Sequence, residues 1–244
     1  MRAVLAIAGS VVADALRRKV VYIVFAFAAF MAIAIPRLPS YGVGVVEAVF
    51  REVSLALMYV VAMVVALSLS ANRVPSEVER RTVYNILGRD VRRWQYLFGS
   101  WLGVLAVMAG VVASFTVVSI GVGGYTYHVL MWRLWQGALA IWLETGVVSA
   151  FAIMISTVTG PVPVTVASLG FLFVAHLGGG LTQAESAGGR NTFYPTMETF
   201  NIINPVAHGS GVSFGYIALM LVVSAAWTGA LLGMGALLFE RKDL

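Results

Sequence analysis

Residues 53–70, VSLALMYVVAMVVALSLS, run directly into residues 71–96, ANRVPSEVERRTVYNILGRDVRRWQY. The first stretch contains no charged side chain and is close in length to the roughly 20 apolar residues that a helix needs to cross a bilayer. The second stretch is the most charged part of the chain. This abrupt change predicts a helix that crosses the membrane and then leaves it for water.

The whole chain has the composition of a membrane protein. Of its 244 residues, 60% are hydrophobic and 11% are charged. A soluble domain is about 45–50% apolar and about 25% charged. The absence of cysteine excludes disulfides, zinc–thiolate sites and cysteine nucleophiles. His128, His176 and His208 do not have the sequence spacing of metal ligands, so we expect no metal site.

The apolar stretches predict an all-α integral membrane protein, a single transmembrane domain over residues 1–244 with six transmembrane helices. The predicted spans cover residues 20–35, 53–70, 97–121, 134–156, 162–177 and 214–238. An amphipathic helix at residues 2–16 is expected on the membrane surface, although this segment also has features of a signal peptide. The third span offers a face of small residues for close helix contact: Gly99, Gly103, Gly110 and Ser114.

The positions of the basic residues predict the orientation. With a cytoplasmic N-terminus and six spans, four of the 16 lysines and arginines fall outside: Arg37, Arg51, Arg133 and Arg190. The other twelve lie inside, as the positive-inside rule requires, so both termini are expected in the cytoplasm. Because these charges flank apolar spans, we interpret the net charge of +5 as a topology signal and expect no nucleic-acid partner.

The loop at residues 72–95 carries the strongest pattern. Ser76 and Glu79 form a capping box, which predicts a short helix over residues 77–87 that Gly88 ends. One face of this helix is apolar, and the opposite face carries Glu77, Arg81 and Asn85, flanked by Arg80 and Tyr84. The pattern favours a docking surface for a cytoplasmic partner. The alternative is an ordinary basic loop that obeys the positive-inside rule.

The stretch PSEVERRTVYNILGRDVRRWQYLFGSWLG, residues 75–103, resembles the first cytoplasmic loop of ABC-transporter permeases of the type-2 exporter class. It is most similar to the branch associated with maturation of multicopper enzymes, including nitrous oxide reductase. The matching residues are Glu77, Glu79, Thr82, Leu87, Arg89, Val91, Arg93, Tyr96 and Gly99. The loop departs from the pattern at Asp90, where proline is usual, and at Ser100, where lysine is common. Asn204 and Pro205 match the family's element before the last span.

The resemblance implies a permease subunit in the cell inner (plasma) membrane, surrounded by lipid and paired with a second permease copy, identical or different. ATP hydrolysis would be coupled to movement of the helix bundle. The chain lacks the phosphate-binding loop of an ATPase, because neither Lys19 nor Lys242 follows a glycine. ATP and magnesium are therefore expected in a separate ATPase subunit, with no catalytic residue and no cofactor here. The residues expected to contact that subunit are Glu77, Glu79, Arg80, Arg81, Thr82, Tyr84, Asn85, Arg89 and Arg93.

Two further regions are candidates for function. Glu144 is an acid deep inside a predicted span, and it is either a substrate or proton site or a packed carboxylate paired with Gln136 or Thr145. The outer segment, residues 178–212, is too long for an idle connection and is expected to hold short helices. We interpret it as a gate or as the contact for an extracytoplasmic partner, with these residues as candidates: Tyr194, Glu198, Asn204 and Pro205.

Two other functions remain open on the sequence. A structural membrane-anchor subunit of a larger complex would show the same topology without transporting anything. A secondary transporter or channel is less favoured, because such proteins typically show inverted repeats and several polar sites inside the membrane.

Overall fold

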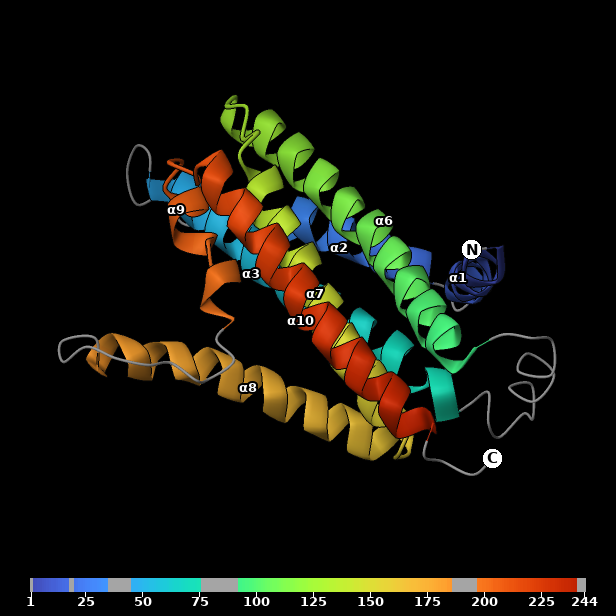
Figure 1. Ribbon diagram of the computed structural model, residues 1–244. Coiled ribbons are helices and arrows are strands. Elements are labelled where there is room, and N and C mark those ends of the chain that lie inside the picture. Colours follow the sequence, from blue (N-terminus) through green and yellow to red (C-terminus); the bar gives the residue numbers. More distant parts are fainter. Residues whose placement is uncertain (1, 18–19, 35–44, 76–91, 186–196, 241–244) are drawn as a thin grey trace.

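A computed structural model describes residues 2–17, 20–34, 45–75, 92–185 and 197–240. Within these ranges the chain forms helices and no strand (Figure 1). The helices are α1 (Arg2–Arg17), α2 (Val20–Ala34), α3 (Val45–Ala71), α6 (Arg93–Tyr127), α7 (Leu134–Ser156), α8 (Pro161–Glu185), η2 (Glu198–Phe200), α9 (Ile203–Ala207) and α10 (Phe214–Glu240). The capped helix expected at residues 77–87 lies outside the described ranges.

Four helical segments are long and apolar enough to cross a membrane: Val45–Pro75, Arg93–Tyr127, Leu134–Ser156 and Phe214–Glu240. The expected class, an all-helical membrane protein, is confirmed at this level. The count of six spans stays a prediction. Helix α2 has 15 residues and α8 has 25, and the crossing of the membrane by these two helices stays a prediction.

Helix α7 lies at the centre of the bundle, packed against α3, α6, α8 and α10. Its fully buried side chains include Val147, Val148, Ala150 and Ile153. Two tryptophans connect it to α6 in opposite directions. The Trp101 indole donates to the Gly146 carbonyl at 2.9 Å, and the Trp142 indole donates to the Leu105 carbonyl at 3.0 Å.

Three helices extend beyond the segments that the sequence predicts. Helix α3 begins at Val45 instead of residue 53, because its first turns are amphipathic and Glu47 pairs with Arg51 across one turn. Helix α6 covers Arg93–Tyr127 instead of residues 97–121. Helix α8 ends at Glu185, so the start of the segment expected as outer loop from residue 178 is helical.

The small residues of α6 allow α1 to approach closely. A Cβ atom on Gly103 would lie 2.5 Å from the Cβ of Val11, and one on Gly99 would lie 3.0 Å from the Val4 carbonyl oxygen. Gly110 has no neighbour within 4 Å of such an atom, so it takes no part in this contact. Helix α1 buries Ile7, Val11 and Ala15 along one face. The apolar face of α1 therefore packs against α6. The position of α1 on the membrane surface stays a prediction.

Helix α8 is the least enclosed of the long helices, and Figure 1 shows it diverging from the bundle. Five of its apolar side chains are more than half exposed: Val162, Val166, Leu169, Phe173 and Val174. The Phe171 ring stacks on Phe151 of α7 at a centroid distance of 4.3 Å. In a bilayer the exposed face would be covered by lipid.

Candidate functional site

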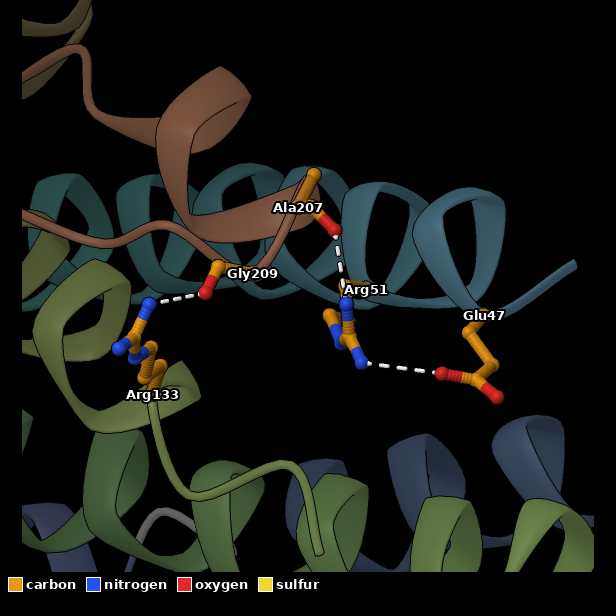
Figure 2. A network of polar contacts seen from close by, with 5 residues as sticks. All are labelled: Glu47, Arg51, Arg133, Ala207 and Gly209. Atoms are coloured by element: carbon orange, nitrogen blue, oxygen red, sulfur yellow. Dashed lines mark hydrogen bonds and ion pairs between the residues drawn. The ribbon is translucent and has the colours of Figure 1, made fainter. Parts of the chain in front are cut away.

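The segment around α9 is held against α3 at the end of the bundle where α3, α7 and α10 begin. Arg51 of α3 donates from Nη1 to the Ala207 carbonyl at 3.1 Å, and its Nη2 lies 3.2 Å from Glu47 Oε2 (Figure 2). Ala207 is the last residue of α9. The guanidinium therefore binds both an acid of its own helix and the carbonyl end of α9.

Helix α7 holds the same segment from the other side. Arg133, just before α7, donates to the carbonyl oxygen of Gly209 (Figure 2). It also donates to the carbonyl oxygen of Ser210. Its guanidinium also lies 5.7 Å from the centroid of the Trp132 ring. Arg51, Arg133 and Gly209 line a small pocket of about 230 Å³ between the two arginines. The segment after α9 is thus fixed by cations on two helices.

Gln136 completes this attachment with a pair of hydrogen bonds to one residue. Its amide nitrogen donates to the Val212 carbonyl at 3.1 Å, and its amide oxygen accepts from the Val212 nitrogen at 2.9 Å. Gly211 approaches so closely that a Cβ would lie 2.4 Å from Gln136 Oε1, and its φ of 66° is in the left-handed region. Only glycine fits this position without strain.

A second polar cluster lies inside the bundle, around Glu144 of α7. The carboxylate is 3% exposed, and its Oε1 accepts from the Tyr59 hydroxyl of α3 at 2.9 Å. His176 Nε2 of α8 lies 3.5 Å from the same oxygen. His176 Nδ1 is 3.1 Å from the carbonyl of Leu172, one turn earlier in α8. The Glu144 side chain therefore joins three helices through one buried acid.

The prediction that Gln136 or Thr145 pairs with Glu144 is wrong. Gln136 binds Val212, as described above, and the Thr145 hydroxyl donates to the Trp142 carbonyl of its own helix at 2.8 Å. Both side chains therefore satisfy backbone groups. Glu144 is instead reached by a tyrosine and a histidine from neighbouring helices.

At the opposite end of the bundle, arginines stand on both sides of the charged loop. Arg73, at the end of the α3 segment, lies 3.3 Å from Asp14 Oδ2 and donates to Ser10 Oγ at 3.0 Å, both on α1. Arg93, the first residue of α6, donates to the carbonyls of Phe239 and Glu240 at the end of α10. The two flanks of residues 76–91 are thus attached to different helices.

One family model, described as ABC-2 family transporter protein, matches residues 6–244. The chain belongs to this family. It is a multi-pass membrane protein and a permease subunit of an ABC transporter. The match confirms the resemblance to type-2 permeases, while the narrower likeness to the multicopper-enzyme branch stays a prediction. No curated protein matches the chain.

In this ABC-2 permease, one of the residues expected to contact an ATPase is in the described part of the chain. That residue is Arg93, the first residue of α6, whose side chain contacts the last turn of α10. The others lie outside the described residues: Glu77, Glu79, Arg80, Arg81, Thr82, Tyr84, Asn85 and Arg89. Their role in coupling stays a prediction.

The candidates of the outer segment have separate positions in the permease. Tyr194 lies outside the described residues. Glu198 begins η2, while Asn204 and Pro205 belong to α9. The Pro205 carbonyl accepts from the nitrogens of Ser210 and Gly211 at 3.0 and 2.9 Å, which closes the turn after α9. The backbone at Pro205 therefore closes this turn, while the part of Pro205 in a gate stays a prediction.

Four residues of these clusters were not singled out for function from the sequence: Tyr59, His176, Arg51 and Arg133. A tyrosine and a histidine in apolar spans give a weak signal, because both residue types are common at helix packing sites. The arginines were counted only toward topology. An arginine directly before a membrane helix could also have been interpreted as a hydrogen-bond donor to the backbone carbonyls of a neighbouring loop.

Proposed function

We propose that the chain is the membrane half of an ATP-driven exporter, which moves in response to a separate ATPase subunit. The observation that carries this proposal is the attachment of both flanks of residues 76–91. Arg73 connects one flank to α1, and Arg93 connects the other to α10. A partner that pushed on this loop would move α1, α6 and α10 together.

Close packing supports transmission of such a push. Helix α1 contacts α6 at Gly99 and Gly103, where there is no room for another atom. Protein interiors packed this tightly transmit displacement instead of absorbing it. Helices α1 and α6 would therefore respond as one body to a force on the loop.

The segment around α9 would act as the gate at the opposite end. Arg51, Arg133 and Gln136 hold it through backbone carbonyls and one backbone nitrogen. Such contacts can break and reform without unfolding a helix. In this proposal Glu198, Asn204 and Pro205 shape the gate, and an extracytoplasmic partner would approach from this side.

ABC-2 permeases generally work with an ATPase subunit and often dimerise, which supports a complex of two permease copies and two ATPase subunits. ATP and magnesium would be bound by the ATPase subunits, because this sequence contains no phosphate-binding loop. The permease itself would catalyse no reaction. Its N- and C-termini would face the cytoplasm, on the side of the ATPase.

The proposal is tested by co-purification in mild detergent. The full-length chain should retain a protein with a phosphate-binding loop, and charge reversal in the E77K/E79K and R80E/R81E variants should release it. Glu52→Lys is the matched control, because Glu52 is exposed on α3 far from the loop and the change in charge per residue is the same. The proposal fails if the loop variants retain the ATPase as well as the wild type does.

A second measurement distinguishes a permease from a structural anchor. In a permease, ATP should change the distance between the two copies, measured by electron paramagnetic resonance with a spin label on Tyr125→Cys. This residue is 86% exposed and the chain has no native cysteine. An anchor that binds the ATPase without moving would show the same distances with and without ATP.

A further inference from the structure

An apolar groove of about 400 Å³ lies on the surface between the start of α6 and the end of α10. Three aromatic side chains of α6 form one wall: Trp94, Phe98 and Trp101. The facing wall on α10 includes three small residues: Gly229, Gly233 and Ala236. The groove lies at the end of the bundle that carries Arg93 and the flanks of the charged loop.

The sequence explains why a groove forms here. Residues 94, 98 and 101 recur at helical spacing, so their rings stand in a row along α6. The Trp101 indole is fixed by its hydrogen bond to the Gly146 carbonyl. Cβ atoms on Gly229 and Gly233 would have no neighbour within 4 Å, so these glycines leave open space between the helices instead of bringing them together.

Two arginines stand in the sequence directly before the aromatic row of α6. Arg92, which is exposed, precedes Trp94 by two residues, and no ion pair of Arg92 occurs among the described residues. The Arg93 guanidinium lies 5.3 Å from the centroid of the Phe239 ring, beside the last turn of α10. Cations at the surface of a membrane attract the phosphates of anionic lipids.

A polar group in the wall also lacks a partner. Thr228 lines the groove and is 5% exposed. Its hydroxyl has no hydrogen-bond partner in the described part of the chain. Buried hydroxyls in proteins are nearly always hydrogen-bonded. A hydrocarbon chain has no acceptor, so only an oxygen of a lipid ester or headgroup could pair with this hydroxyl.

We propose that this groove binds an anionic phospholipid. One acyl chain lies between the aromatic row of α6 and Gly229 and Gly233 of α10, and the phosphate lies at Arg92 and Arg93. Tryptophans at the depth of lipid headgroups suit this placement. A symmetric contact with a second copy fits the groove less well, because it would bring the same patch, with its arginines, from both chains together.

The test is native mass spectrometry of the full-length chain after addition of phosphatidylglycerol or phosphatidylcholine. The wild type should retain phosphatidylglycerol in preference to phosphatidylcholine. The G229L/G233L variant should lose most of both lipids, because its side chains fill the groove. Arg92→Gln should weaken retention of phosphatidylglycerol by about fivefold, the effect of one basic residue near a membrane surface.

Gly110→Leu is the matched control. It makes the same type of substitution at an exposed glycine of α6, outside the groove, whose Cβ would also meet nothing within 4 Å. This variant should bind both lipids as the wild type does. Circular dichroism should show equal helix content in all variants. Unchanged lipid retention by G229L/G233L, or equal retention of the two lipids by the wild type, would overturn the proposal. A variant that lost dimers but kept phosphatidylglycerol would also overturn it and would assign the groove to a second copy.

Discussion

At the scale of single residues, Gly103 shows how closely this fold is packed. We expect Gly103→Ala to lower the free energy of unfolding by about 1–3 kcal/mol, the usual range for overpacking a filled contact. The added methyl group would lie 2.5 Å from Val11 Cβ and 2.9 Å from the Ala8 carbonyl oxygen, so α1 would have to move away from α6. The midpoint of thermal unfolding in detergent measures the change.

The control for this prediction is Gly110→Ala on the same helix. No atom lies within 4 Å of the new methyl group, and alanine favours a helix over glycine by about 0.5–1 kcal/mol. The midpoint should therefore stay the same or rise. Equal destabilisation by both substitutions would show that the contact with α1 does not account for the effect.

The buried acid allows a second prediction at this scale. Glu144→Ala removes the acceptor of the Tyr59 hydroxyl, and a buried hydroxyl without a partner costs about 1–3 kcal/mol. Glu144→Gln keeps an acceptor oxygen at that position and should cost less. The two variants are compared by their thermal unfolding midpoints.

A double-mutant cycle with Tyr59→Phe assigns this cost. In the Tyr59→Phe background no hydroxyl is left unpaired, so Glu144→Ala should be less harmful than in the wild type. Strictly additive effects would contradict the hydrogen bond between α3 and α7. The sequence marked Glu144 as a candidate functional residue because it is an acid inside an apolar span. It could not identify the partner Tyr59, which lies 85 positions away.

At the scale of elements, the segment after α9 depends on one side chain of α7. Replacing Gln136 by leucine leaves the nitrogen and the carbonyl of Val212 without their partner. We expect faster amide hydrogen exchange at residues 209–213, while exchange in the core of α7 stays slow. Mass spectrometry of exchanged peptides measures both regions.

Thr145→Val is the comparison for this prediction. The Thr145 hydroxyl is also buried, but it binds only the Trp142 carbonyl within its own helix. Exchange at residues 209–213 should therefore be unaffected. If Gln136→Leu leaves exchange in this segment at the wild-type rate, the side chain does not hold the segment in solution.

The ends of elements were harder to predict than their centres, and α6 shows why. The stretch GGYTYHVLMW, which begins at Gly123, predicts a connection after the span at residues 97–121, yet the helix continues to Tyr127. Gly123 faces Phe50 and Met131, and its missing side chain gives their atoms the space they fill. Glycine destabilises an exposed helix, but tertiary packing outweighs this preference at a close contact.

At the scale of the whole molecule, the open question of topology has a direct test. A single cysteine at Tyr125 should react with a membrane-impermeant maleimide in intact cells. Cysteines at Ala13 and Glu240 should react only after the membrane is permeabilised. These three residues are exposed, and the chain has no native cysteine. The expectation follows from the excess of basic residues on one side.

The Ala13→Cys variant decides the span count. Six spans place Ala13 and Glu240 on the same side of the membrane. Reaction of Ala13→Cys from outside, with Glu240→Cys protected, would mean that α2 does not cross. The 15 residues of α2 cover only about 22 Å at about 1.5 Å per residue, so this helix would need help from adjoining residues or a thinned bilayer to cross.

Composition and the charged loop were sufficient to predict the membrane class and the permease family. Both predictions depend on local sequence patterns, namely the length of the apolar stretches and the order of the charged residues. The clusters around Glu144 and α9 depend on which faces of distant helices meet, as Arg133 and Gly209 show. Apolar helices offer several faces of similar hydrophobicity, so periodicity alone does not choose between them.

Helix α8 is loosely packed, so its position depends on few contacts with the rest of the bundle. Lipid tails can replace the neighbours of Val166 or Phe173 at little cost, because both surroundings are hydrocarbon. They cannot replace His176 beside the Glu144 carboxylate. The orientation of α8 should therefore change when a polar group competes for Glu144, and it should depend little on the lipid tails that cover the helix. A polar group that displaced His176 from Glu144 would remove the buried polar contact of α8 and leave its apolar contacts, such as the stacking of Phe171 on Phe151.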